Sequence, residues 1–470
     1  MEWNFQLNRR IEAIIFIVIG VLISVFLALI SFHSLKAGII IFLFLFFLFF
    51  LFKFGRLSFN AIIFLLLFCS ILCPPIRFES TPYIRPELIL ILIAWILLFL
   101  GRLAKGESMR LHWTPTHKWF FIFGASILVS ILWAWTVKGF SPSLRDFFEI
   151  AKLMEYFLIF AFVVNLNIKK EDFKKYYILI ICIFLISAIF GFIQYFDLFH
   201  NFNESFIGYI APHHLDEWIG HKRIVGTTGN PNEFGMLMVM ASSLALIGTL
   251  WVRKLNFKTF SFISFCIFSF AVILTLSRSA LIVFLINLLF ILFLQYPKRF
   301  GLRGKTRLIF LVLPTIIILG LIIIQIAPPK FVMRITSALS IETDVSFQSR
   351  LNIWKENLSI WKQSPVFGWG PGKDTMTTIV DNEWLLLLRR YGIIGVVIFV
   401  FWFWNFYSGI GKIVKREEES SFLEIFSVFS QVSLISIAVY MIPAAFYHSL
   451  QLMPILMTFL GLIYSQYYNS

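Results

Sequence analysis

The chain has 470 residues, of which 59% are hydrophobic and 58 are phenylalanine, and its mean hydropathy is +0.86. Uncharged apolar runs of about 17 residues or more, long enough to cross a bilayer as helices, recur from end to end. They exclude a soluble globular protein and predict an all-α, polytopic transmembrane helical bundle, because helices satisfy their own backbone hydrogen bonds in lipid. The net charge of +15 suits anionic lipid headgroups or an anionic substrate, and the sequence shows no nucleic-acid-binding motif.

The apolar runs predict one integral membrane domain, residues 1–470, with about 12–14 spans and no separate soluble domain. The predicted spans cover residues 11–31, 36–52, 57–74, 87–101, 119–137, 147–166, 176–198, 232–252, 257–276, 280–296, 307–326, 383–411, 422–443 and 450–467. Lysine and arginine crowd the loops on one side of this arrangement and are sparse on the other, which places both termini in the cytoplasm. Two longer polar segments, residues 199–231 and 327–382, then lie on the outer face.

The first outer segment enters the eighth span through Arg223 and the sequence Gly-Asn-Pro-Asn-Glu-Phe-Gly. Asn230 suits an N-cap, Pro231 suits the first helical position, and Glu233 completes a pattern resembling a capping box. One explanation of these residues is simply a well-capped helix start. Arg223 is harder to explain in that way. We therefore treat Arg223, Asn230, Asn232 and Glu233 as candidate substrate-binding residues.

A second motif, Ser277-Arg278-Ser279, opens the tenth span directly after the ninth. An arginine in so short a hairpin must lie near the membrane boundary, where it can snorkel to lipid headgroups. The alternative is an anion site, because helix N-termini carry exposed N–H groups and arginine adds a forked donor for phosphate oxygens.

The second outer segment, residues 327–382, contains a predicted amphipathic helix at about 347–363. Apolar residues recur there at helical spacing, which favours a helix lying in the membrane interface. They are Phe347, Leu351, Trp354, Leu358 and Trp361. A glycine-rich turn at 365–372 then delivers the chain to the twelfth span.

The third motif combines Arg350 on that helix with Asp381 at the start of the twelfth span. Each has a plain alternative, since Arg350 suits a solvated helix face and Asp381 suits an N-cap. Arg389 and Arg390, about two turns into the span, are costly in lipid, so we expect the helix to break near Gly392 or to face a polar cavity there.

We expect the three motifs to meet in one cavity that opens to the outer face. Several cations and one carboxylate suit a lipid-linked pyrophosphate, whose developing negative charge arginines would stabilise. The carboxylate would accept the proton of an attacking sugar hydroxyl. No metal and no cofactor are predicted, because the histidines of the first outer segment match no standard zinc spacing. Two further groups of polar residues have structural explanations. The polarity of an outer loop explains His213, His214, Asp216 and His221. Glu149, Lys152 and Glu155 lie on one helix face and can satisfy one another.

These motifs, in this order and spacing, resemble the O-antigen ligase/polymerase superfamily. The resemblance rests on Gly-Asn-Pro-Asn-Glu-Phe-Gly after Arg223, on Leu-Ser-Arg-Ser-Ala, on Arg350 with Trp354 and Gly-Trp-Gly, and on Asp-Asn-Glu-Trp-Leu, and it covers about residues 140–410. It implies a GT-C type glycosyltransferase of the bacterial inner membrane that works without metal, inverts the anomeric carbon and faces the periplasm or cell exterior.

The resemblance also implies roles for individual residues. Arg278 and Arg350 would act catalytically on the pyrophosphate of an undecaprenyl-pyrophosphate-linked glycan donor, with Arg223 as a further contact. Asp381 would be the catalytic base. The remaining candidate substrate-binding residues are Ser277, Ser279, Trp354, Asn382 and Glu383.

The ligase branch of the family typically has histidine at the position of Asp381, so this departure favours a polymerase. The acceptor would then be a lipid-linked saccharide, with membrane lipids, a chain-length regulator and a flippase as further partners. A ligase acting on a lipid or protein acceptor is the alternative within the family. A transporter or flippase is a more distant one, because the charged motifs gather on the outer side instead of at mid-membrane.

Overall fold

The structure is a computed structural model that describes residues 59–73, 76–78, 81–104, 106, 108–166, 168–295, 345–376, 380–415 and 421–467. The predicted spans at 11–31, 36–52 and 307–326 and the start of the second outer segment lie outside the described residues. The chain divides into two compact units, residues 1–112 and 113–470. Each unit is described separately below, and the single-domain organisation stays a prediction.

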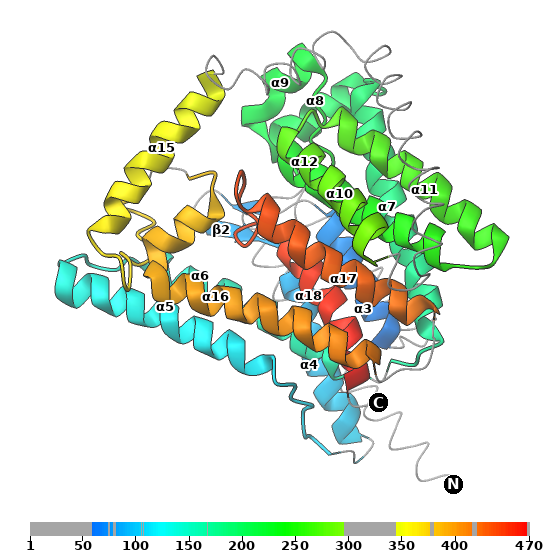
Figure 1. Ribbon diagram of the computed structural model, residues 1–470, viewed down its shortest axis with the longest axis horizontal. Helices are drawn as coiled ribbons and strands as arrows, with labels where there is room; N and C mark the ends of the chain where they lie inside the picture. Colours follow the sequence, from blue (N-terminus) through cyan, green and yellow to red (C-terminus); the bar gives the residue numbers. More distant parts are fainter. Residues whose placement is uncertain are drawn as a thin grey trace. The chain divides into compact units, whose positions relative to one another are not determined.

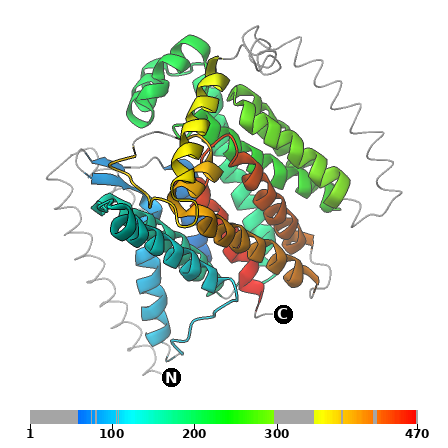
Figure 2. The ribbon, with the colours of Figure 1, turned by 60° about the vertical axis from the view of Figure 1, so that its left-hand side comes forward.

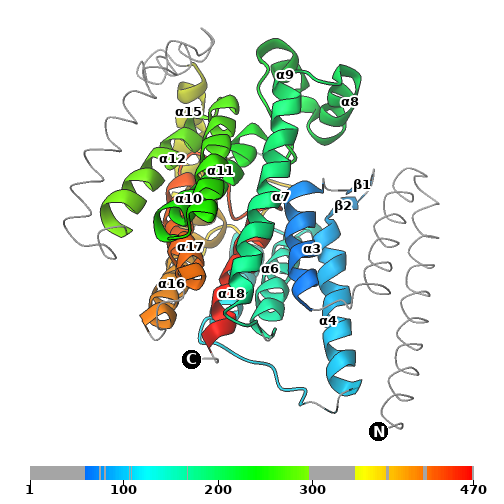
Figure 3. The ribbon, with the colours of Figure 1, turned by 90° about the vertical axis from the view of Figure 1, so that its right-hand side faces the viewer.

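In the first unit, α3 (Phe59–Leu72) and α4 (Pro86–Ala104) pack side by side and are joined by a short antiparallel hairpin, β1 (Ile76–Phe78) and β2 (Thr81–Ile84) (Figure 3). The start of α4 is fixed by Arg85, whose Nε donates to Glu87 at 2.6 Å and whose Nη2 donates to the Ser70 carbonyl at 3.2 Å. All three residues are buried, so this ion pair ties α4 to the end of α3. The hairpin was not predicted from the sequence.

The second unit is a helical bundle (Figure 1). Its elements are α5 (His117–Lys138), α6 (Leu144–Val164), α7 (Asp172–Tyr195), α8 (His200–Ile210), η1 (Pro212–His214), α9 (Leu215–His221), α10 (Pro231–Trp251), α11 (Leu255–Leu274), α12 (Arg278–Phe290), the π-helical turn η2 (Ile291–Gln295), α15 (Val345–Lys362), α16 (Glu383–Lys415), α17 (Ser421–Tyr440), α18 (Leu452–Tyr464) and η3 (Ser465–Tyr467).

Within the described residues, the helical fold confirms the predicted class: seven helices are long and apolar enough to cross a membrane. Each predicted span in that part of the chain corresponds to a helix whose ends differ by a few residues. The helix α6 is not among the seven, and it is also the one that carries Asp146, Glu149, Lys152 and Glu155. Its charges therefore need protein partners in place of lipid.

The centre of the bundle is α10, which packs against α11, α12 and α17 (Figure 1). Of the 18 residues in its most apolar stretch, 94% are buried within the protein. Small residues permit this close packing: a side chain at Gly235 would meet Ala280, and one at Gly248 would meet the Tyr177 hydroxyl. The start of α10, where the first motif lies, is thus held on a rigid central element.

Contacts between helix ends show which loops share an end of the bundle. At one end, Trp251 Nε1 donates to Glu424 at 3.0 Å and Gln466 Nε2 donates to the Ile168 carbonyl at 2.8 Å. The basic loops predicted as cytoplasmic adjoin these residues. The three motifs gather at the other end, where Ser449 Oγ donates to Glu233 at 2.8 Å. Which end faces the cytoplasm stays a prediction.

The helix α16 breaks at Gly392, as the presence of Arg389 and Arg390 inside a span predicted. Gly392 has φ 64° and ψ −169°, and the chain continues as a helix on either side. The glycine-rich turn after α15 supplies the hydrogen bonds that the break removes: Trp369 N–H donates to the Arg389 carbonyl and Gly370 N–H to the Arg390 carbonyl, both at 2.9 Å. The chain leaves α15, drawn in yellow, and returns through this turn to α16, drawn in orange (Figure 2).

We expect Gly392→Ala to destabilise the protein. A non-glycine residue at this positive φ costs about 1–3 kcal/mol, and its Cβ would also collide with the Val366 carbonyl. The measurement is the thermal unfolding midpoint in detergent. The control is Gly411→Ala, since a Cβ there meets only Gln431 Nε2 at 3.6 Å. Equal midpoints for the two variants would contradict the role given to the break.

Candidate functional site

The first motif is held in place by a helix cap. Asn230 Oδ1 accepts hydrogen bonds from the backbone N–H groups of Asn232 at 2.8 Å and Glu233 at 3.4 Å, and Pro231 follows as the first helical residue. For Asn230 the structure therefore supports the cap interpretation. The cap leaves the Asn232 and Glu233 side chains directed at neighbouring elements.

Arg223 joins three segments that are distant in sequence. It is 8% exposed, and its Nη1 donates to Glu217 Oε2 at 2.7 Å, its Nη2 to Asn232 Oδ1 at 3.1 Å and its Nε to the Thr275 carbonyl at 3.1 Å. Guanidinium groups suit such a junction because their donors lie in a fixed fork. Arg223 thus connects α9, the start of α10 and the end of α11.

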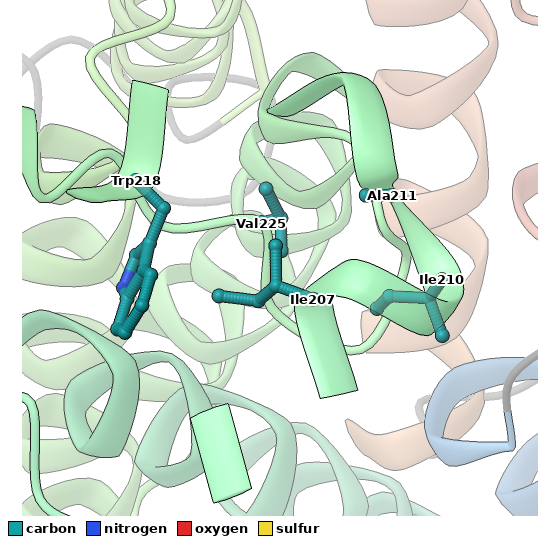
Figure 4. Packing of buried hydrophobic residues seen from close by; sticks show 5 residues of the cluster. All are labelled: Ile207, Ile210, Ala211, Trp218 and Val225. Carbon is teal, nitrogen blue, oxygen red and sulfur yellow. The ribbon is translucent and has the colours of Figure 1, made fainter. Parts of the chain in front are cut away.

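An apolar cluster fixes α9 beside this arginine. Trp218 is fully buried and packs with Ile207, Ile210, Ala211 and Val225, which come from α8, its C-terminal end and the segment just after Arg223 (Figure 4). The ion pair of Lys222 with Asp197 at 2.7 Å closes the same segment onto the end of α7. That hydrogen bond, with a smaller contribution from His200, lowers the pKa of Asp197.

The second motif meets the first through Asn232. Ser277 Oγ donates to Asn232 Oδ1 at 2.8 Å, and it accepts from Ala280 N at 3.3 Å as the N-cap of α12. Ser279 Oγ lies 3.4 Å from Ser277 Oγ. Arg278 is the first residue of α12 and is partly buried. The preceding Leu276 is in the left-handed region with φ 52°, a strained conformation for leucine that the tight hairpin imposes.

The third motif contains an ion pair. Arg350 Nε lies 3.2 Å from Asp381 Oδ2, and the side chains are 32% and 43% exposed. The cap of α16 is Asn382, whose Oδ1 accepts from Leu385 N at 3.0 Å. The N-cap alternative for Asp381 is therefore wrong, and its carboxylate is available to Arg350.

The helix that carries Arg350 has the predicted amphipathic pattern over its described side chains. Leu351, Trp354, Leu358 and Trp361 are partly buried, and exposed polar residues occupy the opposite face. Trp354 lies one turn after Arg350, and its buried indole N–H has no hydrogen-bond partner within the described part of the chain. This donor faces the same side of α15 as Arg350.

His448 and Ser449, in the loop between α17 and α18, connect the third motif to the first. His448 Nδ1 forms a short hydrogen bond with Glu383 Oε1, and Ser449 Oγ donates to Glu233 Oε2 at 2.8 Å. A series of contacts thus connects the three motifs, and their meeting in one cavity open to the outer face stays a prediction. No sequence signal had singled out His448 or Ser449.

A second charged cluster, centred on Glu149, adjoins this region. Glu149 is fully buried, and its Oε1 lies 2.8 Å from Lys373 Nζ, 3.4 Å from Arg390 Nη1 and 3.8 Å from Lys152 Nζ. His448 Nε2 lies 3.2 Å from its Oε2. Sequence reasoning paired Glu149 only with its own helix. The usable signal was a carboxylate inside an apolar span, which requires partners from elsewhere.

The buried Arg389 and the partly buried Arg390 of α16 have different partners. Arg390 Nη1 lies 2.6 Å from His448 Nε2, and Arg389 Nη1 donates to Asn357 Oδ1 on α15 at 2.8 Å. On the exposed surface beside this cluster, Arg145 donates to Asp374 at 2.9 Å, and this hydrogen bond lowers the pKa of Asp374. Among the described residues, no group of His, Cys, Asp and Glu side chains is arranged to hold a metal ion.

Residues 262–400 match the O-antigen ligase family model. This O-antigen ligase match contains the second and third motifs and covers less than a third of the chain. It confirms the resemblance recognised in the sequence and is consistent with the O-antigen ligase/polymerase superfamily. Together with the apolar helices, the match indicates a multi-pass membrane protein that is similar to polysaccharide ligases and polymerases. No curated protein matches it.

In an O-antigen ligase-type site, this arrangement can bind an anion and accept a proton. Arg278 opens α12 next to Ser277, and Arg350 pairs with Asp381 just before α16. The Arg350 guanidinium is exposed enough to exchange its partner. Asp381 supplies a carboxylate, and Trp354 supplies a spare donor. These groups suit a phosphate-bearing sugar substrate.

We expect Glu149→Gln to unfold the protein more readily, because Lys373, Arg390 and Lys152 would lose their shared counter-charge. Removing one partner of a buried ion pair costs about 3–5 kcal/mol. The measurement is the free energy of unfolding in mixed micelles. Arg145→Gln is the control, since its pair with Asp374 is exposed and should contribute little. A Glu149→Gln protein as stable as the control would contradict this account.

Proposed function

We propose that this protein is a glycan polymerase. It transfers an undecaprenyl-pyrophosphate-linked saccharide to a sugar hydroxyl of another lipid-linked repeat unit at the outer face of the membrane. The observation that supports this most is the meeting of the three motifs at one end of the bundle, two of them within the O-antigen ligase match. The match supports a reaction of the O-antigen ligase kind, and the arginines support an anionic substrate.

The Arg350–Asp381 ion pair suggests how binding prepares the reaction. The pyrophosphate of the donor would take Arg350 as a partner, together with Arg278, and would thereby release the Asp381 carboxylate. Trp354 would donate its free indole N–H to a substrate oxygen. Arg223 is held by Glu217 and Asn232 and would support the site from behind.

The transfer itself would be a single displacement. The acceptor hydroxyl oxygen attacks the anomeric carbon, the glycosyl–phosphate bond breaks, and the lipid pyrophosphate leaves with the bonding electron pair. Asp381 accepts the hydroxyl proton, and the arginines stabilise the charge that develops on the leaving group. A single displacement inverts the anomeric configuration, and none of these steps calls for a metal or a cofactor.

A ligase is the second candidate, because the matching family model carries that description. The two functions differ in the acceptor. A polymerase extends a lipid-linked repeat, and a ligase moves the glycan to a different lipid or to a protein. Supplying each acceptor separately to protein in liposomes, with the same lipid-linked donor, distinguishes them by the product formed.

We expect Arg278→Ala and Arg350→Ala each to lower polymer formation by roughly 10²–10³-fold, the effect of losing one donor to a developing anion. The measurement is polymer length and amount on a gel after reaction with lipid-linked repeat units. Arg145→Ala, a rim arginine that is 68% exposed on its side chain, is the control. Full-length polymer from either variant would remove the pyrophosphate role.

Asp381→Asn tests proton acceptance separately from substrate binding. The amide keeps the size of the carboxylate and cannot take the proton, so kcat should fall by roughly 10²–10⁴-fold. The variant should bind the donor at least as well, because Arg350 loses its internal partner. The measurements are kcat and the donor Kd. An unchanged kcat would exclude Asp381 as the base.

A further inference from the structure

We infer that His448 is a positioning residue for this transferase, and that His448 and Ser449 act as a clasp that aligns the Asp381–Glu383 turn with the start of α10. The inference rests on the proposed function. The clasp lies outside the matched residues 262–400 and outside every sequence motif discussed above. It depends on two sets of contacts from one short loop.

The first set fastens the loop to α16. His448 Nε2 lies 2.6 Å from Arg390 Nη1 on α16 and 3.2 Å from Glu149 Oε2 on α6. Its Nδ1 forms a short hydrogen bond with Glu383 Oε1. The backbone N–H of His448 also donates to Glu383 Oε2 at 3.4 Å. One imidazole therefore bridges two α16 side chains that lie two turns apart.

The second set fastens the loop to α10 and the segment before it. Ser449 Oγ donates to Glu233 Oε2 at 2.8 Å, and Gln451 Nε2 donates to the Thr227 carbonyl at 3.4 Å. Ser449 Oγ also accepts from Leu452 N at 3.2 Å, so the serine is anchored to the start of α18. The clasp is thus attached to a third helix as well as to the two that it joins.

The residues that the clasp holds are next to the reacting groups. Glu383 is fully buried and lies two residues after Asp381, and Glu233 follows Asn232, which binds both Arg223 and Ser277. A change in the clasp would shift the carboxylate relative to the pyrophosphate-binding side. A misplacement of about 1 Å can cost roughly 10²-fold in rate without removing any reacting group.

The test uses three variants at His448 in the full chain, reconstituted in liposomes with lipid-linked repeat units. His448→Ala removes the side-chain contacts to Glu383, Arg390 and Glu149. His448→Asn places an amide near the position of Nδ1, so that it can donate to Glu383, and it falls short of Arg390. His448→Gln reaches toward Arg390 instead. For each variant we would measure kcat, the donor KM and the thermal unfolding midpoint.

We expect His448→Ala to lower kcat by roughly 10²-fold with the donor KM within about twofold of wild type. His448→Asn should recover most of this loss, since the bond to Glu383 sets the turn that carries Asp381. His448→Gln should recover less. The matched control is Ser436→Ala on α17, the helix before the clasp. It removes a buried hydrogen bond of 2.5 Å from Ser436 Oγ to Asn287 Oδ1. It should lower the midpoint and leave kcat unchanged.

The results separate the two proposals. Wild-type protein that transfers no sugar would overturn the proposed function. Suppose that the wild-type protein is active. A normal kcat in His448→Ala, or a kcat reduced only as much as in Ser436→Ala, would then overturn the clasp alone. So would a His448→Asn variant no better than His448→Ala. If His448→Ala does not fold, Ser449→Ala and Ser449→Thr repeat the test on the other set of contacts: the alanine variant should lose kcat and the hydroxyl of threonine should restore it.

Discussion

The structure depends on the compensation of charge inside an apolar bundle. Glu149 is fully buried in α6, and an isolated carboxylate there would be prohibitively costly. It is tolerated because Lys373, Arg390 and His448 reach it from the glycine-rich turn, α16 and the last loop. These partners come from widely separated parts of the chain, so satisfying one charge draws the elements around the candidate site together.

The broken helix α16 follows from the same requirement. A continuous helix would place Arg389 and Arg390 among apolar neighbours, whereas the break at Gly392 opens the backbone to the turn at 365–372. Both carbonyls then accept hydrogen bonds from Trp369 and Gly370. The break also leaves a short helical segment between Asn382 and Gly392 that carries the Glu383 and Arg390 side chains toward His448. Backbone geometry and charge pairing thus support one another.

Much of this fold was predictable from local pattern. Apolar periodicity gave the spanning helices and α15 within the described residues, although it did not give α8 and α9 in the first outer segment. Capping rules gave Asn230, and the cost of two arginines inside a span gave the break at Gly392. Local pattern did not find His448 or the β-hairpin, because neither has a periodic signal. Asp381 was uncertain as a cap for a related reason: the competing Asn382 is one residue away, and only the fold shows which side chain turns back to the helix.

The near-complete enclosure of α10 has a consequence for biogenesis. Its neighbours α11 and α12 follow it directly in the chain, whereas α17 is synthesised much later. Until α17 arrives, the side of α10 that it covers must rest against lipid or the insertion machinery. Truncated chains that end before α17 should therefore be recognised as unfinished by membrane quality control, even though every earlier helix can already insert.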